Sequence, residues 1–222
     1  MHGLKRNIAV RSRQRFNVEQ LAPWLLPDIP RGEAAPPIDW ATLFGNERPV
    51  EIEVGFGKGM HLIQAAVSSP DSNFLGIEID RKCDLYTAAR VAVRQLPNVK
   101  LACADALEVL TQRVAPASVA VVHVYFPDPW WKQRHRKRRV FTAEFVEQVA
   151  RVLRPAGLFH IATDVEPYFE VIQKLLGKAP AFQAIAARPA TEGAHDMDYM
   201  TNFERKARRK GKPVFRAAYV KA

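Results

Sequence analysis

A glycine-rich turn with an acidic residue just before it is the first feature whose residue types and spacing indicate chemistry. Glu53 precedes Gly55, Gly57 and Gly59 in the segment IEVGFGKG, which continues into the helix-like stretch MHLIQAAVS. Glycines let the backbone turn tightly and approach a ligand, and the following helix directs its N-terminus at that ligand. A dinucleotide fingerprint would need glycine at Met60, and a P-loop would need Ser or Thr after Gly-Lys. Phosphate cradling is therefore not the predicted role, and an ordinary glycine turn remains the alternative.

Two further carboxylates follow the next two apolar segments. Glu78 lies in GIEID, 19 residues after Gly59, and Asp105 follows VKLACA. A carboxylate there can accept hydrogen bonds from ribose hydroxyls, or from an adenine amino group. The alternatives are an ion pair with a lysine for Glu78 and a helix N-cap for Asp105. Three acids after successive strands favour a nucleoside with a cationic sulfonium, and GxGxG is the loop spacing of class I methyltransferases that use S-adenosylmethionine.

A proline-flanked aspartate precedes a strongly basic run. In FPDPWWK, the prolines on both sides of Asp128 stiffen the turn from which its carboxylate projects. Trp130 and Trp131 offer flat faces for base stacking, and Lys132 with the run RHRKRR offers contacts to phosphates. A tight turn followed by a solvated loop is the alternative interpretation. The coincidence of these three features favours RNA binding next to the cofactor.

Two later segments carry further candidate residues. Asp164 ends the apolar segment LFHIATD, although it could instead cap the helix that follows. Thr201, Asn202, Phe203 and Glu204 form a TxxE pattern that also fits a helix capping box. The basic segment RKARRKGK follows directly, as a basic run also follows the proline-flanked aspartate.

Hydrophobic patterning predicts an α/β domain that positions these residues. Apolar, β-branched strands alternate with helical segments from residue 38 onward, which is typical of a doubly wound, mostly parallel sheet with ligands at the carboxyl ends of its strands. Strands are expected at 49–55, 73–80, 99–106, 118–126 and 158–165, and helices at 60–68, 81–96, 140–155 and 166–176. Residues 1–37, with a basic start and four prolines in PDIPRGEAAPP, are expected to form an arm and linker before a methyltransferase domain at 38–222.

The charge distribution points to a polyanionic partner. The 222 residues carry a net charge of +10, from 33 Lys and Arg against 23 Asp and Glu. Three segments without acidic residues, 5–15, 132–139 and 205–212, hold 17 of the 33 basic residues. The rest of the chain is therefore acidic, and the positive charge is concentrated where a nucleic acid backbone could bind.

Several classes of protein are excluded by composition. The longest apolar stretch, near residues 119–126, is far shorter than the roughly 20 residues of a membrane-spanning helix. The basic start has no apolar region of a secretory signal, so a cytoplasmic location is expected. Cys83 and Cys103 lack metal-site or redox spacing and are expected to be buried, and no metal site is predicted.

These motifs together resemble the bacterial tRNA (guanine-N7)-methyltransferases. The resemblance extends from about Arg11 to the end of the chain, and its most specific parts are the proline-flanked aspartate with its basic tail and the late TxxE segment. It implies a class I fold, S-adenosylmethionine as cofactor, and transfer of a methyl group to the variable-loop guanosine at tRNA position 46. It indicates no obligatory protein partner.

Carried over residue by residue, the resemblance implies that Asp128 is catalytic and also contacts the cofactor. The other residues expected at the cofactor are Glu53, Gly55, Gly57, Glu78 and Asp105. The residues expected at the RNA substrate are Lys132, Asp164, Thr201, Asn202, Phe203 and Glu204. Two positions depart from the family pattern: Trp131 stands where relatives often have His or Pro, and Asn202 where Lys or Arg is common.

Guanine N7 carries a lone pair and no proton, so catalysis is expected to rest on alignment and exclusion of water. Two other functions remain open from the sequence alone. One is an exocyclic-amine nucleic-acid methyltransferase, which would carry (N/D)PPY where this chain has DPWW. The other is a non-catalytic RNA-binding protein on a methyltransferase scaffold.

Overall fold

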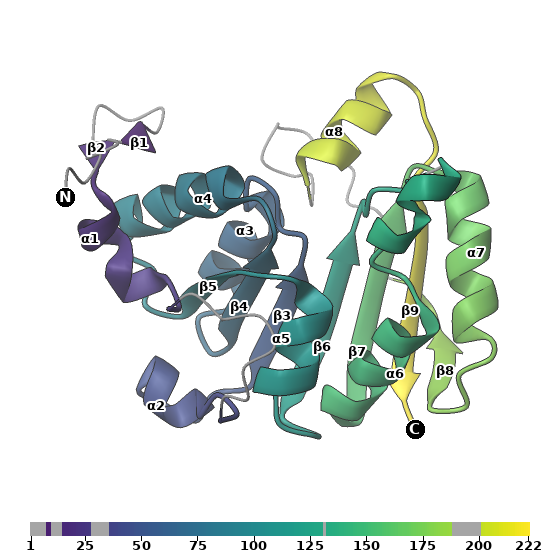
Figure 1. Ribbon diagram of the computed structural model, residues 1–222, viewed down its shortest axis with the longest axis horizontal. Coiled ribbons are helices and arrows are strands. Elements are labelled where there is room, and N and C mark those ends of the chain that lie inside the picture. Colours follow the sequence, from purple (N-terminus) through teal and green to yellow (C-terminus); the bar gives the residue numbers. More distant parts are fainter. Residues whose placement is uncertain (1–7, 10–14, 28–35, 131, 188–200) are drawn as a thin grey trace.

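A seven-stranded sheet with helices on both faces forms the body of the computed structural model (Figure 1). The structure describes residues 8–9, 15–27, 36–130, 132–187 and 201–222; for residues 8, 9, 133, 136, 137 and 202 it describes the backbone alone. The strand order is β5-β4-β3-β6-β7-β9-β8. The first five are parallel to one another, whereas β9 is antiparallel to both β7 and β8. Their bounds are β3 Val50–Val54, β4 Asn73–Glu78, β5 Val99–Cys103, β6 Val119–Tyr125, β7 Leu153–Thr163, β8 Phe182–Ile185 and β9 Phe215–Lys221.

The helices pack in two groups, each over its own apolar cluster. Helices α3 and α4 cover the cluster that contains Phe56 and Leu101, and α5, α6 and α7 cover the larger cluster that contains Ile52 and Phe145. Burial of apolar side chains on both faces is what a doubly wound parallel sheet requires. The bounds of these helices are α3 Met60–Ser68, α4 Arg81–Val93, α5 Ala106–Arg113, α6 Ala143–Val152 and α7 Glu166–Leu176. No helix in the described ranges is long and apolar enough to cross a membrane.

The elements expected from the sequence are present, with two differences. Thr142 caps α6 as predicted, accepting a hydrogen bond from the Phe145 N–H at 3.1 Å. Strand β7, however, begins at Leu153 rather than 158, because Leu153 pairs with Val119 ahead of an irregularity in register. Strands β8 and β9 complete the sheet and were not expected from the sequence pattern.

The C-terminal part of the chain returns to the carboxyl edge of the parallel strands. The short helix α8 (Asn202–Arg209) precedes β9 and lies above the carboxyl ends of the parallel strands in Figure 1. The 3₁₀ helix η2 (Gln133–Arg138) follows β6 at the same edge. The basic segments 132–139 and 205–212 overlap η2 and α8, so both lie at this edge of the sheet.

The described part of the N-terminal segment packs against the edge strand β5. This segment forms β1 (Ile8–Ala9), β2 (Arg15–Phe16), α1 (Val18–Leu21) and η1 (Ala22–Trp24), before the isolated helix α2 (Trp40–Phe44). Leu21 is fully buried, and the Trp24 indole donates a hydrogen bond to the Leu96 carbonyl at 2.8 Å. The Leu26 N–H donates to the Leu101 carbonyl at 2.7 Å, so this stretch is anchored to the sheet. The division at residue 37 stays a prediction.

Candidate active site

A cavity of about 240 Å³ joins the glycine turn to helix α8. Its lining includes Glu53, Gly55 and Gly57 from the end of β3, and Thr201 and Phe203 from the start of α8. These two groups are separated by about 150 residues in sequence. The fold therefore brings a predicted cofactor segment and a predicted RNA segment to one space.

The glycine turn adopts a conformation that favours glycine and is held by Glu78. The φ angles of Gly55, Gly57 and Gly59 are 74°, 53° and 64°. A residue with a side chain would be strained in this left-handed conformation. One oxygen of Glu78 accepts from the Gly57 N–H at 2.8 Å, and the other accepts from the Asp80 N–H at 3.0 Å. Each carboxylate oxygen has a second acceptor position, so Glu78 can still receive a ribose hydroxyl.

Glu53 is a buried carboxylate at the wall of this cavity. Its side chain is only 3% exposed, and its Oε2 lies 3.1 Å from Nδ1 of His61 on the first turn of α3. A buried carboxylate requires hydrogen bonds or a cationic neighbour to remain ionised. Glu53 is thus suited to face the cationic part of a ligand that enters the cavity.

A polar network lies beneath the cavity, between β3 and β6. His123 on β6 is 2.9 Å from the Tyr125 hydroxyl through Nδ1 and 2.8 Å from Oε2 of Glu51 through Nε2. Burial lowers the pKa of His123, and the hydrogen bond to Glu51 opposes this only in part. Burial raises the pKa of Glu51 and is the largest single influence, but hydrogen bonds from His123 and Ser72 and the charges of His123 and His61 together outweigh it, so the carboxyl pKa is lowered. At neutral pH a neutral His123 donates from Nε2 to Glu51 and accepts from Tyr125, whose ring lines the cavity.

The lowered pKa of His123 predicts an acid-dependent loss of stability. In the unfolded chain this histidine takes up a proton as the pH falls through about 6.5, whereas in the folded protein it stays neutral to lower pH. Protonation of the unfolded state therefore reduces the free energy of unfolding below about pH 6.5, by up to about 1.4 kcal/mol per pH unit. Above about pH 7.5 the contribution vanishes.

Urea denaturation of the wild type and of His123→Gln between pH 5.5 and 8 measures this effect. The wild type should lose stability toward pH 5.5 more steeply than the variant, because glutamine does not titrate. In the wild type the lowered pKa keeps Glu51 ionised over this range, and the glutamine amide of the variant can still donate a hydrogen bond to it. Parallel pH profiles of the two proteins would show that His123 takes up its proton in the folded state.

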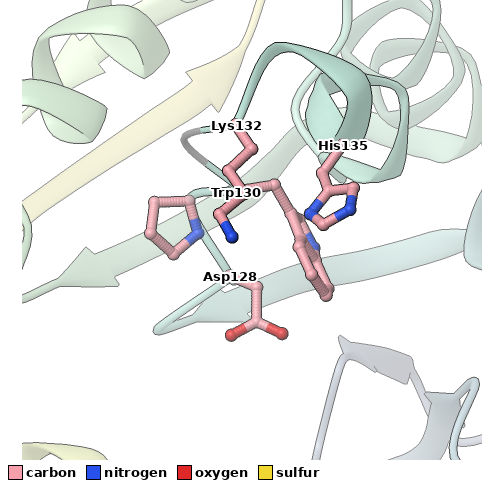
Figure 2. Close-up of a pocket in the computed structure, with 5 residues that line it drawn as sticks. Asp128, Trp130, Lys132 and His135 are labelled. Atoms are coloured by element: carbon pink, nitrogen blue, oxygen red, sulfur yellow. The ribbon is translucent and has the colours of Figure 1, made fainter.

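A second cavity, of about 370 Å³, is formed by the loop after β6 (Figure 2). The loop is held to the neighbouring strand by a hydrogen bond from the Phe126 N–H to the Ala162 carbonyl at 2.7 Å. Arg139 fixes its other end by donating from Nε to the Pro129 carbonyl at 2.7 Å. Lining residues are Asp128, Pro129, Trp130, Lys132 and His135.

The side chains of this loop present a carboxylate and a cation on one small surface. Asp128 and Lys132 are both exposed, and Figure 2 shows the Lys132 ammonium directed toward the Asp128 side of the loop. The Trp130 ring contacts His135 edge-on at 5.5 Å between centroids, and the Arg138 guanidinium lies 5.2 Å from its centroid. Trp131, the second expected stacking residue, lies outside the described residues.

The residues of the TxxE segment have different environments. Thr201 caps α8 by accepting from the Glu204 N–H at 3.0 Å. The Glu204 side chain is fully buried and pairs with Arg208 at 2.9 Å and with Arg216 of β9. Phe203 is 53% exposed and stacks on Phe126 with ring centroids 6.1 Å apart. The side chain of Asn202 lies outside the described residues.

Asp105 and Asp164 line neither cavity, although each lies at the carboxyl edge of the sheet. Asp105 caps α5, with Oδ1 accepting from the Leu107 N–H at 2.8 Å, so the N-cap alternative is present in the structure. Asp164 does not cap α7, whose N-cap residue is Val165 without a side-chain hydrogen bond. The capping explanation for Asp164 is thereby removed.

Several lining residues were not expected from the sequence. His61, Tyr125, Arg205 and Lys206 all line the first cavity. His61 lies two residues after the glycine turn, and this position on the first helical turn was the available signal. Cys83 also lines the cavity. Both Cys83 and Cys103 are only half-buried, so the expectation that the two thiols are buried was wrong. Among the described residues, no cluster of three or more His, Cys, Asp or Glu could hold a metal ion.

Comparisons with solved structures confirm the fold class. The 16S rRNA methyltransferase KamB aligns with a TM-score of 0.59 and 19% identity, over 82% of this chain and 93% of that chain. An S-adenosylmethionine-dependent methyltransferase from Aquifex aeolicus aligns with a TM-score of 0.54 and 13% identity, over 83% and 94% of the respective chains. At sequence identities this low, the structural similarity shows that the chain has the class I methyltransferase fold and nothing more specific.

Sequence relatives are considerably more similar. The family model described as "Putative methyltransferase" matches residues 47–217. A tRNA (guanine-N(7)-)-methyltransferase of Rhodopirellula baltica is 43% identical over 190 residues, covering 83% of this chain and 70% of the relative. One of Sodalis glossinidius is 36% identical over 214 residues, covering 94% and 85%. With these similarities over most of its length, the chain belongs to the tRNA (guanine-N(7)-)-methyltransferase family.

Proposed function

We propose that this enzyme methylates N7 of the variable-loop guanosine, nucleotide 46, of tRNA, with S-adenosylmethionine as methyl donor. The observation that carries the proposal is the cavity in which the glycine turn of β3 meets Thr201 and Phe203 of α8. Cofactor and guanine must approach within bonding distance, and this cavity is where their predicted residues meet. The substrate is expected in the cytoplasm, and no obligatory protein partner is proposed.

The residues at the glycine turn fit the chemistry of this cofactor. When bound, S-adenosylmethionine supplies an electrophilic methyl group on a positively charged sulfur. Glu53 is buried at the cavity wall, where its negative charge compensates a cationic ligand. Glu78 is assigned to the ribose hydroxyls and Asp105 to the adenine amino group, through the Asp105 oxygen not used for capping. Gly55 and Gly57 leave room for close approach of the ligand to the backbone.

Asp128 is assigned to orientation of the guanine and to electrostatic stabilisation. N7 needs no base because its lone pair carries no proton, so the chain has to align N7 with the methyl carbon and sulfur. The guanine ring becomes cationic as the methyl group is transferred. The Asp128 carboxylate, projecting from a loop fixed by Phe126 and Arg139, would stabilise that charge as it develops.

The remaining residues assigned to the RNA substrate come from the loop after β6, the end of β7 and the start of α8. Lys132 is assigned to a phosphate, while Asp164, Thr201, Asn202 and Phe203 are assigned to the nucleotide, with Phe203 supplying an exposed aromatic face. Reading of the guanine edge by Glu204 would require its carboxylate to leave Arg208 and Arg216. In its described position Glu204 instead fixes α8 against β9.

A tRNA with 7-deazaguanosine at position 46 tests the proposed acceptor atom. Replacing N7 by C–H removes the nucleophile and leaves the exocyclic amine and the rest of the base unchanged. Tritiated methyl transfer from S-adenosylmethionine should be lost with this tRNA and retained with an otherwise identical tRNA that carries guanosine. Equal incorporation into both would place the methyl group elsewhere, as expected for an exocyclic-amine methyltransferase.

A further inference from the structure

A group of cations lies beside the cofactor turn, outside all three basic segments recognised in the sequence. Lys58 belongs to the glycine turn and lines the first cavity, and its Nζ lies 6.0 Å from the ring centroid of Tyr86 on α4. Arg90, one turn further along α4, places its guanidinium 5.9 Å from the same ring and donates to the Lys58 carbonyl. Arg94 donates to the Arg90 carbonyl at 3.0 Å. We call Lys58, Arg90 and Arg94 the α4 track.

Ion pairs do not neutralise the cations of the α4 track in the part of the chain that the structure describes. In the described ranges, no carboxylate forms an ion pair with any of its three cations. Burial lowers the pKa of Arg90, and the positive charge of Arg94 lowers it further. Lys58 and Arg94 are exposed at the two ends of the track. Like charges gathered around an aromatic ring without acidic partners are typical of surfaces that bind a polyanion.

The α4 track runs from the first cavity toward the N-terminal strands β1 and β2. It begins at Lys58, which lines the same cavity as the residues of α8, and continues along α4, which lies apart from α8 in Figure 1. Helix α4 contacts β1, and Figure 1 shows α4 extending from the site toward the β1-β2 hairpin. Arg15, an exposed residue of that hairpin, lies within the basic N-terminal segment. The track therefore connects the cavity with the basic N-terminal region.

We propose that the α4 track binds the sugar-phosphate backbone of the tRNA, on the side of the target nucleotide opposite to η2 and α8. This inference rests on the proposed function and extends it, because a nucleotide inserted into the cavity has phosphates leading both toward and away from it. If basic residues lay on one side of the target nucleotide alone, the phosphates on its other side would have no positive charge from the protein. Contacts of this kind are independent of base sequence and sensitive to salt.

Lys58 alone could not establish this role, because a cavity-lining lysine can also bind the cofactor. Arg94 is the informative position: it is exposed and it lines neither cavity. The matched control is Arg48, another exposed arginine that donates to one backbone carbonyl, that of Pro70, at 2.9 Å. Arg48 lies just before β3, outside α4 and outside the linings of both cavities.

The test compares Arg94→Glu with Arg48→Glu in the full-length protein, using filter binding of a tRNA transcript over a series of salt concentrations. Arg94→Glu should raise the Kd for tRNA about five- to tenfold near 0.15 M salt and reduce the salt slope by about 1. Arg48→Glu should change the Kd by less than about twofold. The Kd for S-adenosylmethionine should be unchanged in both variants. Arg94→Gln, which removes the charge without reversing it, should show an intermediate loss of tRNA affinity.

Equal tRNA affinity and equal salt slopes for Arg94→Glu, Arg48→Glu and the wild type would overturn the α4 track. That result is distinguishable from failure of the proposed function. A wild-type protein that methylates nucleotide 46 while Arg94→Glu binds tRNA normally refutes only the track. A wild-type protein that binds tRNA but does not methylate it refutes the proposed function.

Discussion

Replacement of Asp128 by asparagine should lower kcat for tRNA methylation by about 10²- to 10³-fold. Asparagine preserves the shape of the side chain and one acceptor oxygen but removes the negative charge. The carboxylate is exposed on a loop that hydrogen bonds hold at both Phe126 and Pro129, so it is positioned before substrate binds. Charge stabilisation of the cationic methylguanine ring is therefore the property that the variant loses.

Single-turnover kinetics with saturating tRNA separate this effect from binding. The Kd for S-adenosylmethionine should stay within about threefold of the wild type, because the first cavity does not include Asp128 in its lining. Asp71→Asn is the control, since Asp71 is an exposed carboxylate just before β4, at the amino edge of the sheet. A kcat for Asp128→Asn that equals that of Asp71→Asn would remove Asp128 from the mechanism.

Replacement of Gly59 by alanine should lower the free energy of unfolding by about 2 to 4 kcal/mol. Two causes add at this position. The φ of 64° strains any residue with a Cβ atom, and a Cβ would lie 2.2 Å from Cγ2 of Thr87 on α4. The turn and α4 would have to separate, so we also expect the Kd for S-adenosylmethionine to rise at least about tenfold.

Gly45→Ala is the matched control for backbone strain alone. Gly45 has a φ of 69°, but a Cβ there would meet no atom within 4 Å. The Gly45→Ala variant should therefore lose only about 1 kcal/mol of unfolding free energy. Thr87→Ser removes the clashing methyl group and retains the hydroxyl that donates to the Gly57 carbonyl. Chemical denaturation should show that Gly59→Ala lowers the free energy of unfolding clearly less in the Thr87→Ser background than in the wild type. If Gly59→Ala and Gly45→Ala destabilise equally, the contact with Thr87 does not limit this position.

Local sequence was sufficient for the parallel half of the fold. Apolar β-branched runs and a capping residue such as Thr142 depend on neighbours in sequence, and these elements formed close to the expected bounds, apart from the earlier start of β7. Strands β8 and β9 escaped prediction because their stability depends on distant partners, as in the pairing of Phe215 with Thr163. Strand β8 has only four residues, and β9 lies between β7 and β8, so neither carries a clear periodic signal of its own.

The candidate site likewise has parts that local sequence predicts and parts that depend on contacts between distant segments. The glycine turn and the proline-flanked Asp128 are recognisable because their geometry is encoded within a few residues. Contacts between distant segments are not encoded locally: His61 with Glu53, Phe203 with Phe126, and Glu204 with Arg216. The α4 track was missed for the same reason, since its three cations are scattered over residues 58–94, where four Asp and Glu lie between them.

Mapping the methylated atom tests the central claim most directly. The purified enzyme would be incubated with S-adenosylmethionine and an unmodified tRNA transcript, followed by reduction and aniline cleavage, which break the chain at N7-methylguanosine. We predict one cleavage, at nucleotide 46, and N7-methylguanosine as the methylated nucleoside in a complete digest. Incorporation of methyl groups without N7-methylguanosine, or no incorporation under conditions in which the tRNA is bound, would contradict the proposed function.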